Sequence, residues 1–458
     1  MKKAITLLVI ACISSLSYAQ CWKEISTFTE HTMAIKTDGT LWLWGLNNFG
    51  QLGDASVTDE DRPIQIGTAN DWKYVSAGNF NSMAIKKDGS LWAWGANDKG
   101  QLGDGTTNTK YSPVKIGTDL NWKIVSAAYL HTVAIKTDGT LWAWGENVSG
   151  QLGDSTLSSA NAPVQIGADT NWQTVSAGYN QTLAIKTNGS LWAWGGNNNG
   201  QLGNGTFVLK RSPVQIGTAT NWKTVSTCYT STIAVKANGT LYAWGFNNYG
   251  QLGDSSTTNR NAPVQIGTDS TWQMATTGFL HSIAVKANGS LWAWGANGYG
   301  NLGDSTIIDS HTPIQIGIDL NWKTATAGYS HSAAIKTDST LWTWGGNYQG
   351  QLGNGTISTM VLNRSQLNCL ATAITEHDFS ENLFAISPNP VKDFLNINRA
   401  SNKSLPVKKL IITSSIGQTV YTEEENYQQT NISQLATGIY IVELITDKGN
   451  WIGKFVKE

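Results

Sequence analysis

A tryptophan returns every fifty residues through most of this chain, and no residue is inserted between one copy and the next. The seven copies begin at Trp22, Trp72, Trp122, Trp172, Trp222, Trp272 and Trp322, and the last copy ends near Leu370. A fixed period of this length is the signature of a repeat architecture, in which each unit buries its apolar face against its neighbours. The fold must therefore be built from seven copies of one small motif.

Each unit has the pattern of four short strands. In the third unit we expect strands at residues 123–127, 131–136, 140–145 and 163–167. An Asp-Gly or Asn-Gly pair, such as Asp138-Gly139, separates the second strand from the third and predicts a type I′ hairpin. With 21 Trp, 47 Gly and 14% charged residues, the composition is typical of a turn-rich β protein. Four strands per unit describe one blade, so the sequence predicts a seven-bladed β-propeller.

A solenoid of stacked units is the rival architecture. Solenoid ends need polar caps, whereas the first and last units keep the same apolar tryptophans as the middle ones, which favours a closed ring. Trp42 and Trp44 alternate with single residues, so such pairs lie on one face of their strand, where we expect them to pack between blades rather than hold a cofactor. The seventh unit departs from the pattern, with Asp338-Ser339 at its hairpin and residues 363–368 in place of the usual fourth strand.

The units resemble the regulator of chromosome condensation repeat. The third unit carries the resemblance in Trp144-Gly145-Glu146-Asn147, which is followed by Gly150-Gln151-Leu152-Gly153. The resemblance implies a seven-bladed propeller over residues 20–370. It implies less about function, because that family includes nuclear nucleotide-exchange factors, signalling proteins and secreted bacterial protein binders.

Residues 1–19 have the pattern of a secretory signal peptide. Lys2 and Lys3 precede an apolar run over residues 4–13, and Ser17-Tyr18-Ala19 offers small residues where a signal peptidase cleaves. A lipoprotein with its lipid on Cys21 is disfavoured, because Gln20 stands where a small residue is needed. No other apolar stretch approaches the ~20 residues that span a bilayer. We therefore expect a secreted protein.

A second domain follows the repeats. Residues 371–384 are predicted to be a polar linker, and strands expected at 394–397, 409–413, 418–421, 438–445 and 451–456 suggest a small immunoglobulin-like β-sandwich over residues 385–458. This segment resembles the type A sorting domain of the type IX secretion system of Bacteroidetes. The resemblance is carried by Ser387-Pro388-Asn389-Pro390, Ser415-Ile416-Gly417-Gln418, Leu435-Ala436-Thr437-Gly438-Ile439-Tyr440 and Lys454-Phe455-Val456-Lys457. It implies export through that machinery to the medium or the outer cell surface of a Gram-negative bacterium. An ordinary immunoglobulin-like stalk is the alternative.

Charge and motifs argue against several function classes. The formal net charge of −1 provides no basic field for nucleic acid. Nucleophile elbows, phosphate loops and paired metal-binding cysteines do not occur, so we predict no enzyme activity, no cofactor and no metal. Four histidines share one repeat position with an asparagine, a glutamine and a serine, which indicates a structural hydrogen-bonding site. The occupants are His31, Asn81, His131, Gln181, Ser231, His281 and His331.

Two further expectations concern turns and cysteines. An Asp or Asn follows each Gly-Gln-Leu-Gly turn, as Asp54 does, and stabilisation of the turn by this side chain explains it better than calcium. Residues equivalent to Cys369 and Cys21 lie two apart within the repeat, so we predict a disulfide between them that closes the ring. Cys228 is predicted to be buried and free.

The loop after the first strand and the long loop after the third emerge on the same side of the predicted ring. This side varies most between units and is rich in aromatic residues, which we name the aromatic crown. Its members are Phe49, Phe80, Tyr129, Tyr179, Tyr229, Tyr249, Phe279, Tyr299, Tyr329 and Tyr348. Either these rings form a binding surface for a protein or glycan, or the tyrosines pack beneath the long loops.

The sequence thus predicts a monomeric, secreted or cell-surface propeller that binds a protein or glycan without catalysis. One alternative is a guanine-nucleotide-exchange-like regulator, which the family resemblance suggests. The other is a polysaccharide-active enzyme, which needs convergent carboxylates where only scattered ones such as Glu30, Asp98 and Glu146 occur.

Overall fold

The computed structural model describes residues 21–367, 384–399, 407–414, 419–424, 428–446 and 449–458, and none of them is helical. The chain divides into two compact units, residues 1–369 and 370–458. The signal peptide predicted at 1–19 lies outside the described residues, as does the linker predicted at 371–384 apart from its last residue. Nowhere in the described parts is there a helix with the length and apolarity that crossing a membrane requires.

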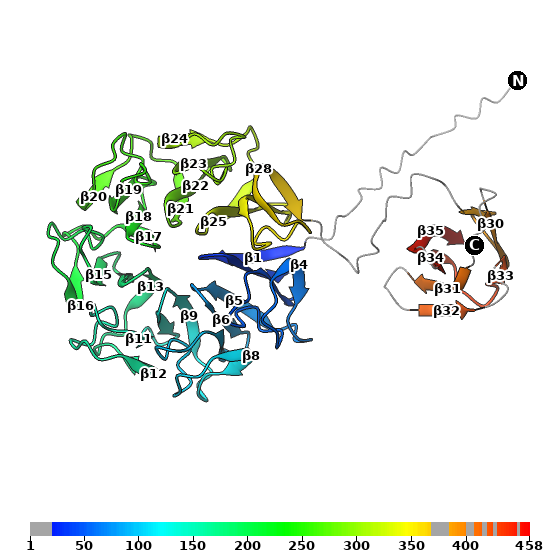
Figure 1. The fold of residues 1–458 in the computed structure, drawn as a ribbon, viewed down its shortest axis with the longest axis horizontal. Coiled ribbons are helices and arrows are strands. Elements are labelled where there is room, and N and C mark those ends of the chain that lie inside the picture. Colours follow the sequence, from blue (N-terminus) through cyan, green and yellow to red (C-terminus); the bar gives the residue numbers. More distant parts are fainter. Residues whose placement is uncertain (1–20, 368–383, 400–406, 415–418, 425–427, 447–448) are drawn as a thin grey trace, which may run out of the picture. The chain divides into compact units, whose positions relative to one another are not determined.

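The first unit is a ring of seven four-stranded antiparallel sheets, which confirms the seven-bladed propeller (Figure 1). Blades 1 to 3 contain β1 (Trp22–Thr27), β2 (His31–Lys36), β3 (Leu41–Gly45), β4 (Glu60–Gln65), β5 (Trp72–Ala77), β6 (Asn81–Lys86), β7 (Leu91–Gly95), β8 (Lys110–Lys115), β9 (Trp122–Ala127), β10 (His131–Lys136), β11 (Leu141–Gly145) and β12 (Ala160–Gln165). Blades 4 and 5 contain β13 (Trp172–Ala177), β14 (Gln181–Lys186), β15 (Leu191–Gly195), β16 (Lys210–Gln215), β17 (Trp222–Thr227), β18 (Ser231–Lys236), β19 (Leu241–Gly245) and β20 (Arg260–Gln265). Blades 6 and 7 contain β21 (Trp272–Thr277), β22 (His281–Lys286), β23 (Leu291–Gly295), β24 (Ser310–Gln315), β25 (Trp322–Ala327), β26 (His331–Lys336), β27 (Leu341–Asn347) and β28 (Ser358–Leu367).

Two local predictions need correction. In the third blade, β12 begins three residues before the expected 163, because a bulge between Ala143 and Gly145 lets Gly145 pair with Ala160. The hairpin between β10 and β11 is not of type I′, since Gly139 has a positive φ (79°) and Asp138 does not. The Gly139 amide donates to the Lys136 carbonyl at 3.0 Å, which describes a type I turn followed by a left-handed residue.

The contacts between blades explain the Gly-Gln-Leu-Gly signature. The buried Trp94 of the second blade donates its indole Nε1–H to the Gln51 carbonyl oxygen of the first at 2.8 Å. Gly53 lies two residues after Gln51, and a Cβ on it would lie 2.7 Å from Trp94 Nε1. A side chain at Gly53 would therefore displace the indole that joins the two blades.

The ring closes by repeating these contacts between the seventh blade and the first. Trp44 Nε1 donates to the Gln351 carbonyl oxygen at 3.0 Å, and the Trp22 amide donates to the Ser339 carbonyl at 3.0 Å. Cys21 is disulfide-bonded, whereas its predicted partner Cys369 lies outside the described residues, so this pairing stays a prediction. Cys228 is buried and free, as predicted.

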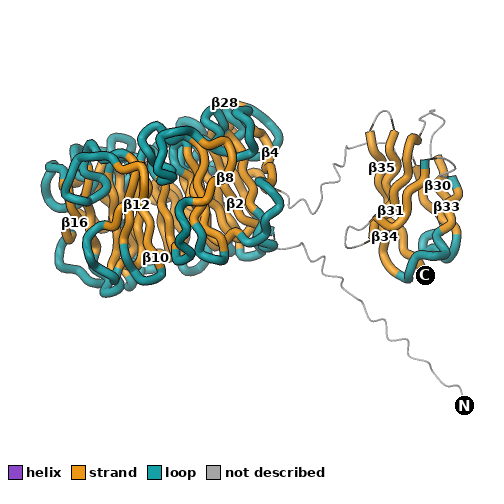
Figure 2. The backbone as a smooth tube through the Cα atoms, turned by 90° about the horizontal axis from the view of Figure 1, so that it is seen from below, coloured by secondary structure: helices purple, strands orange, loops and turns teal. Residues whose placement is uncertain are grey.

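The second unit is a small β-sandwich. One sheet contains β29 (Phe384–Ser387), β30 (Phe394–Arg399) and β33 (Gln429–Asn431). The other contains β31 (Val407–Ser414), β32 (Thr419–Glu423), β34 (Gly438–Thr446) and β35 (Gly449–Lys457). Leu395 and Ile397 of the first sheet share a buried core with Val442, Leu444 and Phe455 of the second. Within this unit the strands lie side by side (Figure 2). The same figure shows the strands of the propeller side by side, with loops covering both of its faces.

Candidate functional site

The two faces of the propeller carry different loops. The Leu46 amide donates to the Glu30 carbonyl at 2.9 Å, so the loop after the first strand touches the start of the long loop after the third. On the opposite face, the Trp72 amide donates to the Gly39 carbonyl at 3.1 Å, which brings the hairpin beside the inter-blade linker. We name the face of the long loops the upper face and the other the lower face.

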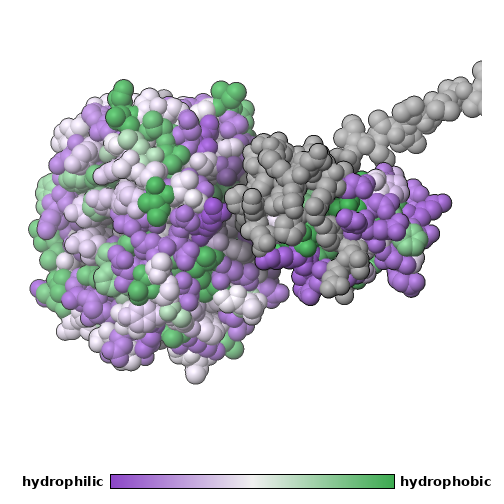
Figure 3. Space-filling model, turned by 45° about the vertical axis from the view of Figure 1, so that its right-hand side comes forward, coloured by the Kyte–Doolittle hydropathy of each residue, from purple (hydrophilic) through white to green (hydrophobic). Residues whose placement is uncertain are grey.

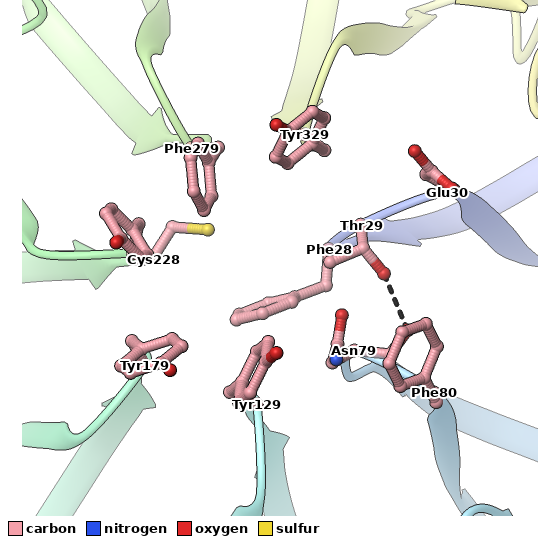
Figure 4. A pocket seen from close by; sticks show the side chains of 11 residues that line it. Phe28, Thr29, Glu30, Asn79, Phe80, Tyr129, Tyr179, Cys228, Phe279 and Tyr329 are labelled. Atoms are coloured by element: carbon pink, nitrogen blue, oxygen red, sulfur yellow. Dashed lines mark hydrogen bonds between the residues drawn. The ribbon is translucent and has the colours of Figure 1, made fainter.

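A pocket of about 350 Å³ opens at the centre of the upper face (Figure 4). Five of the rings that line it come from one repeat position in consecutive blades and form an unbroken arc. These are Tyr129, Tyr179, Tyr229, Phe279 and Tyr329, with successive centroid distances of 4.3, 5.2, 3.9 and 4.5 Å. With Phe80, six of the ten members of the predicted crown therefore line one cavity.

The arc is open at blades 1 and 2. Thr29 and Asn79 occupy its repeat position there, and the Thr29 hydroxyl donates to the Asn79 carbonyl at 2.6 Å (Figure 4). Glu30 and Phe80 complete the lining on this side, and Phe80 packs on Phe49 with centroids 4.7 Å apart. The pocket thus has an aromatic wall on one side and a polar, acidic wall on the other.

Phe28 forms the floor of the pocket. Its ring extends toward the middle of the channel (Figure 4), at a repeat position where the other blades carry only glycine, alanine or cysteine. Phe28 and Cys228 also line a second cavity of about 350 Å³ that lies along the inner strands. Phe28 therefore separates the upper pocket from the rest of the channel. Burial raises the pKa of the Cys228 thiol to about 12, so the thiol is neutral.

The outer members of the crown surround the pocket. Tyr249 and Tyr299 are 42% and 45% exposed. Tyr348 is half-buried and lies 6.0 Å from Tyr299 between ring centroids, and its hydroxyl donates to Glu30 Oε1 at 2.6 Å. Phe246 links Tyr249 to the inner arc, with centroids 6.4 Å from Tyr249 and 6.5 Å from Tyr229.

Two carboxylates give this region its charge. Burial raises the pKa of Glu30, and the negative charge of Asp59 raises it further, whereas the hydrogen bond from Tyr348 lowers it. Burial likewise raises the pKa of Glu146, which Lys99 lowers. Glu146 is close enough to Tyr179 to help raise the pKa of that phenol, after burial and the neighbouring tyrosines. Among the residues that line the pocket, Glu30 is the one charged side chain.

The repeat position that holds four histidines serves blade packing instead of the pocket. His131 is fully buried, and its Nε2 lies 3.0 Å from the Thr182 hydroxyl of the next blade. Equivalent bonds join His31 to Ser82, His281 to Ser332 and His331 to Thr32. Burial lowers the pKa of each of these imidazoles to about 3. The residues after the Gly-Gln-Leu-Gly turns are also structural, since Asp54 Oδ1 accepts hydrogen bonds from the Ser56 amide and Asn47 Nδ2.

Comparison with protein families gives three matches. A model of the RCC1-like domain matches residues 74–381, and a model of the regulator of chromosome condensation (RCC1) repeat matches residues 38–85. A model of the secretion system C-terminal sorting domain matches residues 385–458. Such a domain indicates handling by the type IX secretion machinery and export to the cell surface or medium in Bacteroidetes-like bacteria.

One individual protein is similar to a short stretch of the sequence, and two solved structures are similar in fold. The ultraviolet-B receptor UVR8 of Arabidopsis thaliana is 44% identical over 43 residues, which is 9% of this chain and a tenth (10%) of the receptor's own length. Human WBSCR16 is similar in structure, with a TM-score of 0.65 and 22% identity over 71% of this chain and 93% of its own. Yeast RCC1 (Prp20), solved with Kap60 bound, gives a TM-score of 0.65 and 18% identity over 84% of this chain and 91% of its own.

Proposed function

The chain belongs to the RCC1-like domain family, and from that premise we propose that it is an exported, monomeric propeller that binds a protein or glycan through the aromatic crown without catalysis. Propellers of this family are mainly regulatory or binding proteins. The sorting domain supports a role outside the cell. The observation that carries the proposal is the arc of five rings around a pocket on the face whose loops vary most.

Rigid aromatic side chains suit a binding role. They offer large contact areas at a low cost in conformational entropy, and they concentrate at the centres of protein interfaces. Two of the outer rings, Tyr249 and Tyr299, are nearly half exposed although each has apolar neighbours beside it. Simple packing beneath the long loops would have buried them.

The polar groups of the pocket favour binding over hydrolysis. Glycoside hydrolysis uses a pair of carboxyl groups that flank the scissile bond. Glu30 is the one carboxylate among the lining residues, and its Oε1 is already bonded to the Tyr348 hydroxyl. The nucleotide-exchange alternative requires a cytosolic protein, so a cytoplasmic pool in fractionated cells would revive it.

The test is a binding screen of the full chain against glycan arrays and surface-protein panels. Replacing Tyr249, Tyr299 and Tyr348 together by alanine is expected to weaken binding of any ligand found and to leave thermal unfolding nearly unchanged. Because Tyr348 also bonds Glu30, the double variant Tyr249→Ala with Tyr299→Ala, which keeps Tyr348, measures the contribution of the exposed rings more directly. Tyr111→Ala serves as control, since Tyr111 is 48% exposed on β8 and is not a member of the crown. Undiminished binding by the double variant, or a large loss of stability, would return these rings to a packing role.

A further inference from the structure

The central pocket points to a specific ligand chemistry, and the inference rests on the binding function proposed above. We infer that the pocket receives an arginine side chain presented by a protein partner, with the guanidinium against the aromatic arc and Glu30 beside it. Its volume of about 350 Å³ lies at the lower end of the roughly 300–1,000 Å³ typical of ligand pockets. That space suits one long side chain better than an extended oligosaccharide.

The aromatic arc supplies π faces for a cation. Neighbouring rings of the arc are tilted by 40°, 30° and 46° at three of its contacts and by 73° at the fourth, between Tyr179 and Tyr229. At centroid distances of 3.9–4.5 Å the three tilted contacts bring neighbouring faces together. The faces left open are those at the two ends of the arc, on Tyr129 and Tyr329, because Asn79 and Thr29 stand where the next rings would be (Figure 4). A cation within about 6 Å of a ring centroid is attracted by the ring, and guanidinium groups are the commonest partners.

The lower face shows how this chain uses such rings when it has a cation of its own. Lys136 Nζ lies 4.7 Å from the centroid of Trp122 and 3.8 Å from that of Trp142. A lysine at this repeat position lies over two rings in every blade, namely Lys36, Lys86, Lys136, Lys186, Lys236, Lys286 and Lys336. On the upper face, by contrast, no lysine or arginine is among the residues that line the pocket. The aromatic wall there lacks an internal cation, which an external one can supply.

Glu30 supplies the complementary charge. Its Oε1 accepts the hydrogen bond from Tyr348, and its Oε2 takes part in none of the hydrogen bonds formed by the described residues. A carboxylate held on one oxygen is oriented, and its other oxygen can accept from a guanidinium N–H. Glu146 adds negative charge on the side of Tyr179. The charge of the pocket thus favours a cation over a neutral or anionic group.

Phe28 limits how deep such a side chain can reach. Because its ring closes the channel below the arc, the pocket accepts one group end-on and does not pass a chain through the ring. On the side of the propeller seen in Figure 3, apolar residues form small separate patches among hydrophilic ones. A protruding arginine on a partner's surface fits these limits.

The experiment compares two peptides on the full chain by isothermal titration calorimetry at low ionic strength. One is acetyl-Gly-Gly-Arg-Gly-Gly-amide, and the other carries citrulline, which has nearly the same shape and no charge, in place of arginine. We expect the arginine peptide to bind about tenfold or more tightly than the citrulline peptide. Equal binding, or binding of neither, would overturn the inference, and this comparison requires no variant to fold.

Matched variants locate the site. Tyr329→Leu is expected to weaken arginine binding about fivefold, whereas Tyr329→Phe keeps the π face and should stay within about twofold of the wild type. Glu30→Gln should weaken it about fivefold or more, and Glu60→Gln, which removes the same charge from the same blade outside the pocket, should not. Equal losses for Glu30→Gln and Glu60→Gln would show a general charge effect and overturn the inference.

The outcomes separate this inference from the broader function. Suppose that a screened glycan binds, that Tyr329→Leu abolishes its binding and that the arginine peptide does not compete with it. The crown is then a binding surface, but the inferred ligand class is wrong. If the arginine peptide binds as expected and no screened ligand depends on Tyr249 and Tyr299, the arginine site in the pocket is supported. The proposed binding role of the outer rings of the crown is then wrong.

Discussion

Acidification should destabilise the propeller because four of its histidines are buried in the neutral form. Burial lowers the pKa of His31, His131, His281 and His331 to about 3, from an ordinary value of 6.5. Between these two pH values the unfolded chain binds more protons than the folded one. The free energy of unfolding therefore falls as the pH falls from about 6.5 toward 3, and this part of it is unchanged above 6.5.

The size of the effect follows from the shift. Each pH unit inside this window costs ~1.4 kcal/mol per histidine, so lowering the pH to 5 costs roughly 2 kcal/mol for each, or about 8 kcal/mol for all four. Glu24 acts in the opposite direction, because burial raises its pKa to about 7 and the folded state then binds the proton more tightly. This opposing contribution, of roughly 2 kcal/mol over the same range, makes the total less diagnostic than a comparison of variants.

His131→Gln isolates one histidine, and the chain itself shows that the site accepts glutamine. Gln181 occupies the equivalent position in the fourth blade, where its Nε2 donates to the Thr227 hydroxyl at 2.7 Å. Relative to the wild type, His131→Gln is expected to lose about 2 kcal/mol less stability between pH 7.5 and pH 5. The reverse change, Gln181→His, should lose about 2 kcal/mol more.

Urea unfolding followed by tryptophan emission measures this difference. All 21 tryptophans except Trp451 lie within the repeats, so the signal reports the propeller even in the full chain. An identical pH dependence for the wild type and both variants would refute the reasoning. It would mean that these imidazoles either reach solvent in the folded protein or remain neutral in the unfolded chain.

Three further predictions follow from named contacts. Gly153→Ala should destabilise the propeller by several kcal/mol, because the added Cβ would meet Trp194 Nε1 at 2.6 Å. The control Gly167→Ala, with a similar positive φ and no atom within 4 Å of the added Cβ, should cost only about 1–2 kcal/mol. Equal shifts in thermal unfolding would contradict the role of the Trp194 contact. Non-reducing peptide mapping should recover residues 21 and 369 in one linked pair, and separate peptides would rule out the staple. A small alkylating reagent at pH 8 should label Cys228 slowly in the folded wild type and faster in Phe28→Ala, and equal rates would show that Phe28 does not close the channel.

The strands and the ring could be predicted because the fifty-residue period turns one chain into seven aligned copies. The hairpin type could not, because an Asp-Gly pair suits both a type I′ turn and a type I turn followed by a left-handed glycine. The deciding contact is the Thr140 amide, which donates to Asp138 Oδ1 at 3.0 Å and so holds Asp138 in the second kind of turn. The short strands β29 and β33 were also missed, since three or four residues carry too little alternation to be recognised.

The candidate site was predictable only in part, because the sequence shows which residues share a repeat position but not how they are spaced around the axis. Comparing the seven copies finds a position that is aromatic in five blades, from Tyr129 to Tyr329, and predicts which face it occupies. It does not show that these rings enclose a cavity, because that depends on the spacing of blades around the axis. Phe28 was overlooked although a signal existed, namely one large side chain at a position that is otherwise small, as in Gly78 and Ala128.

Closure and recognition use different parts of each blade, and this separation lets one surface vary while the ring stays intact. The bond from each inner tryptophan is made to a backbone carbonyl, so it survives when Asn301 replaces the usual glutamine, and Trp344 still donates there at 3.0 Å. The arc position is less restricted in its side chain, because its bonds to the next blade are made by the backbone amide, as where Tyr329 donates to the Thr29 carbonyl at 3.1 Å. Thr29, Asn79, Phe279 and the tyrosines all occupy it without altering the neighbouring strands. Substitutions in the arc should therefore change ligand affinity far more than stability, whereas substitutions at the glycines beside the inner tryptophans should do the reverse.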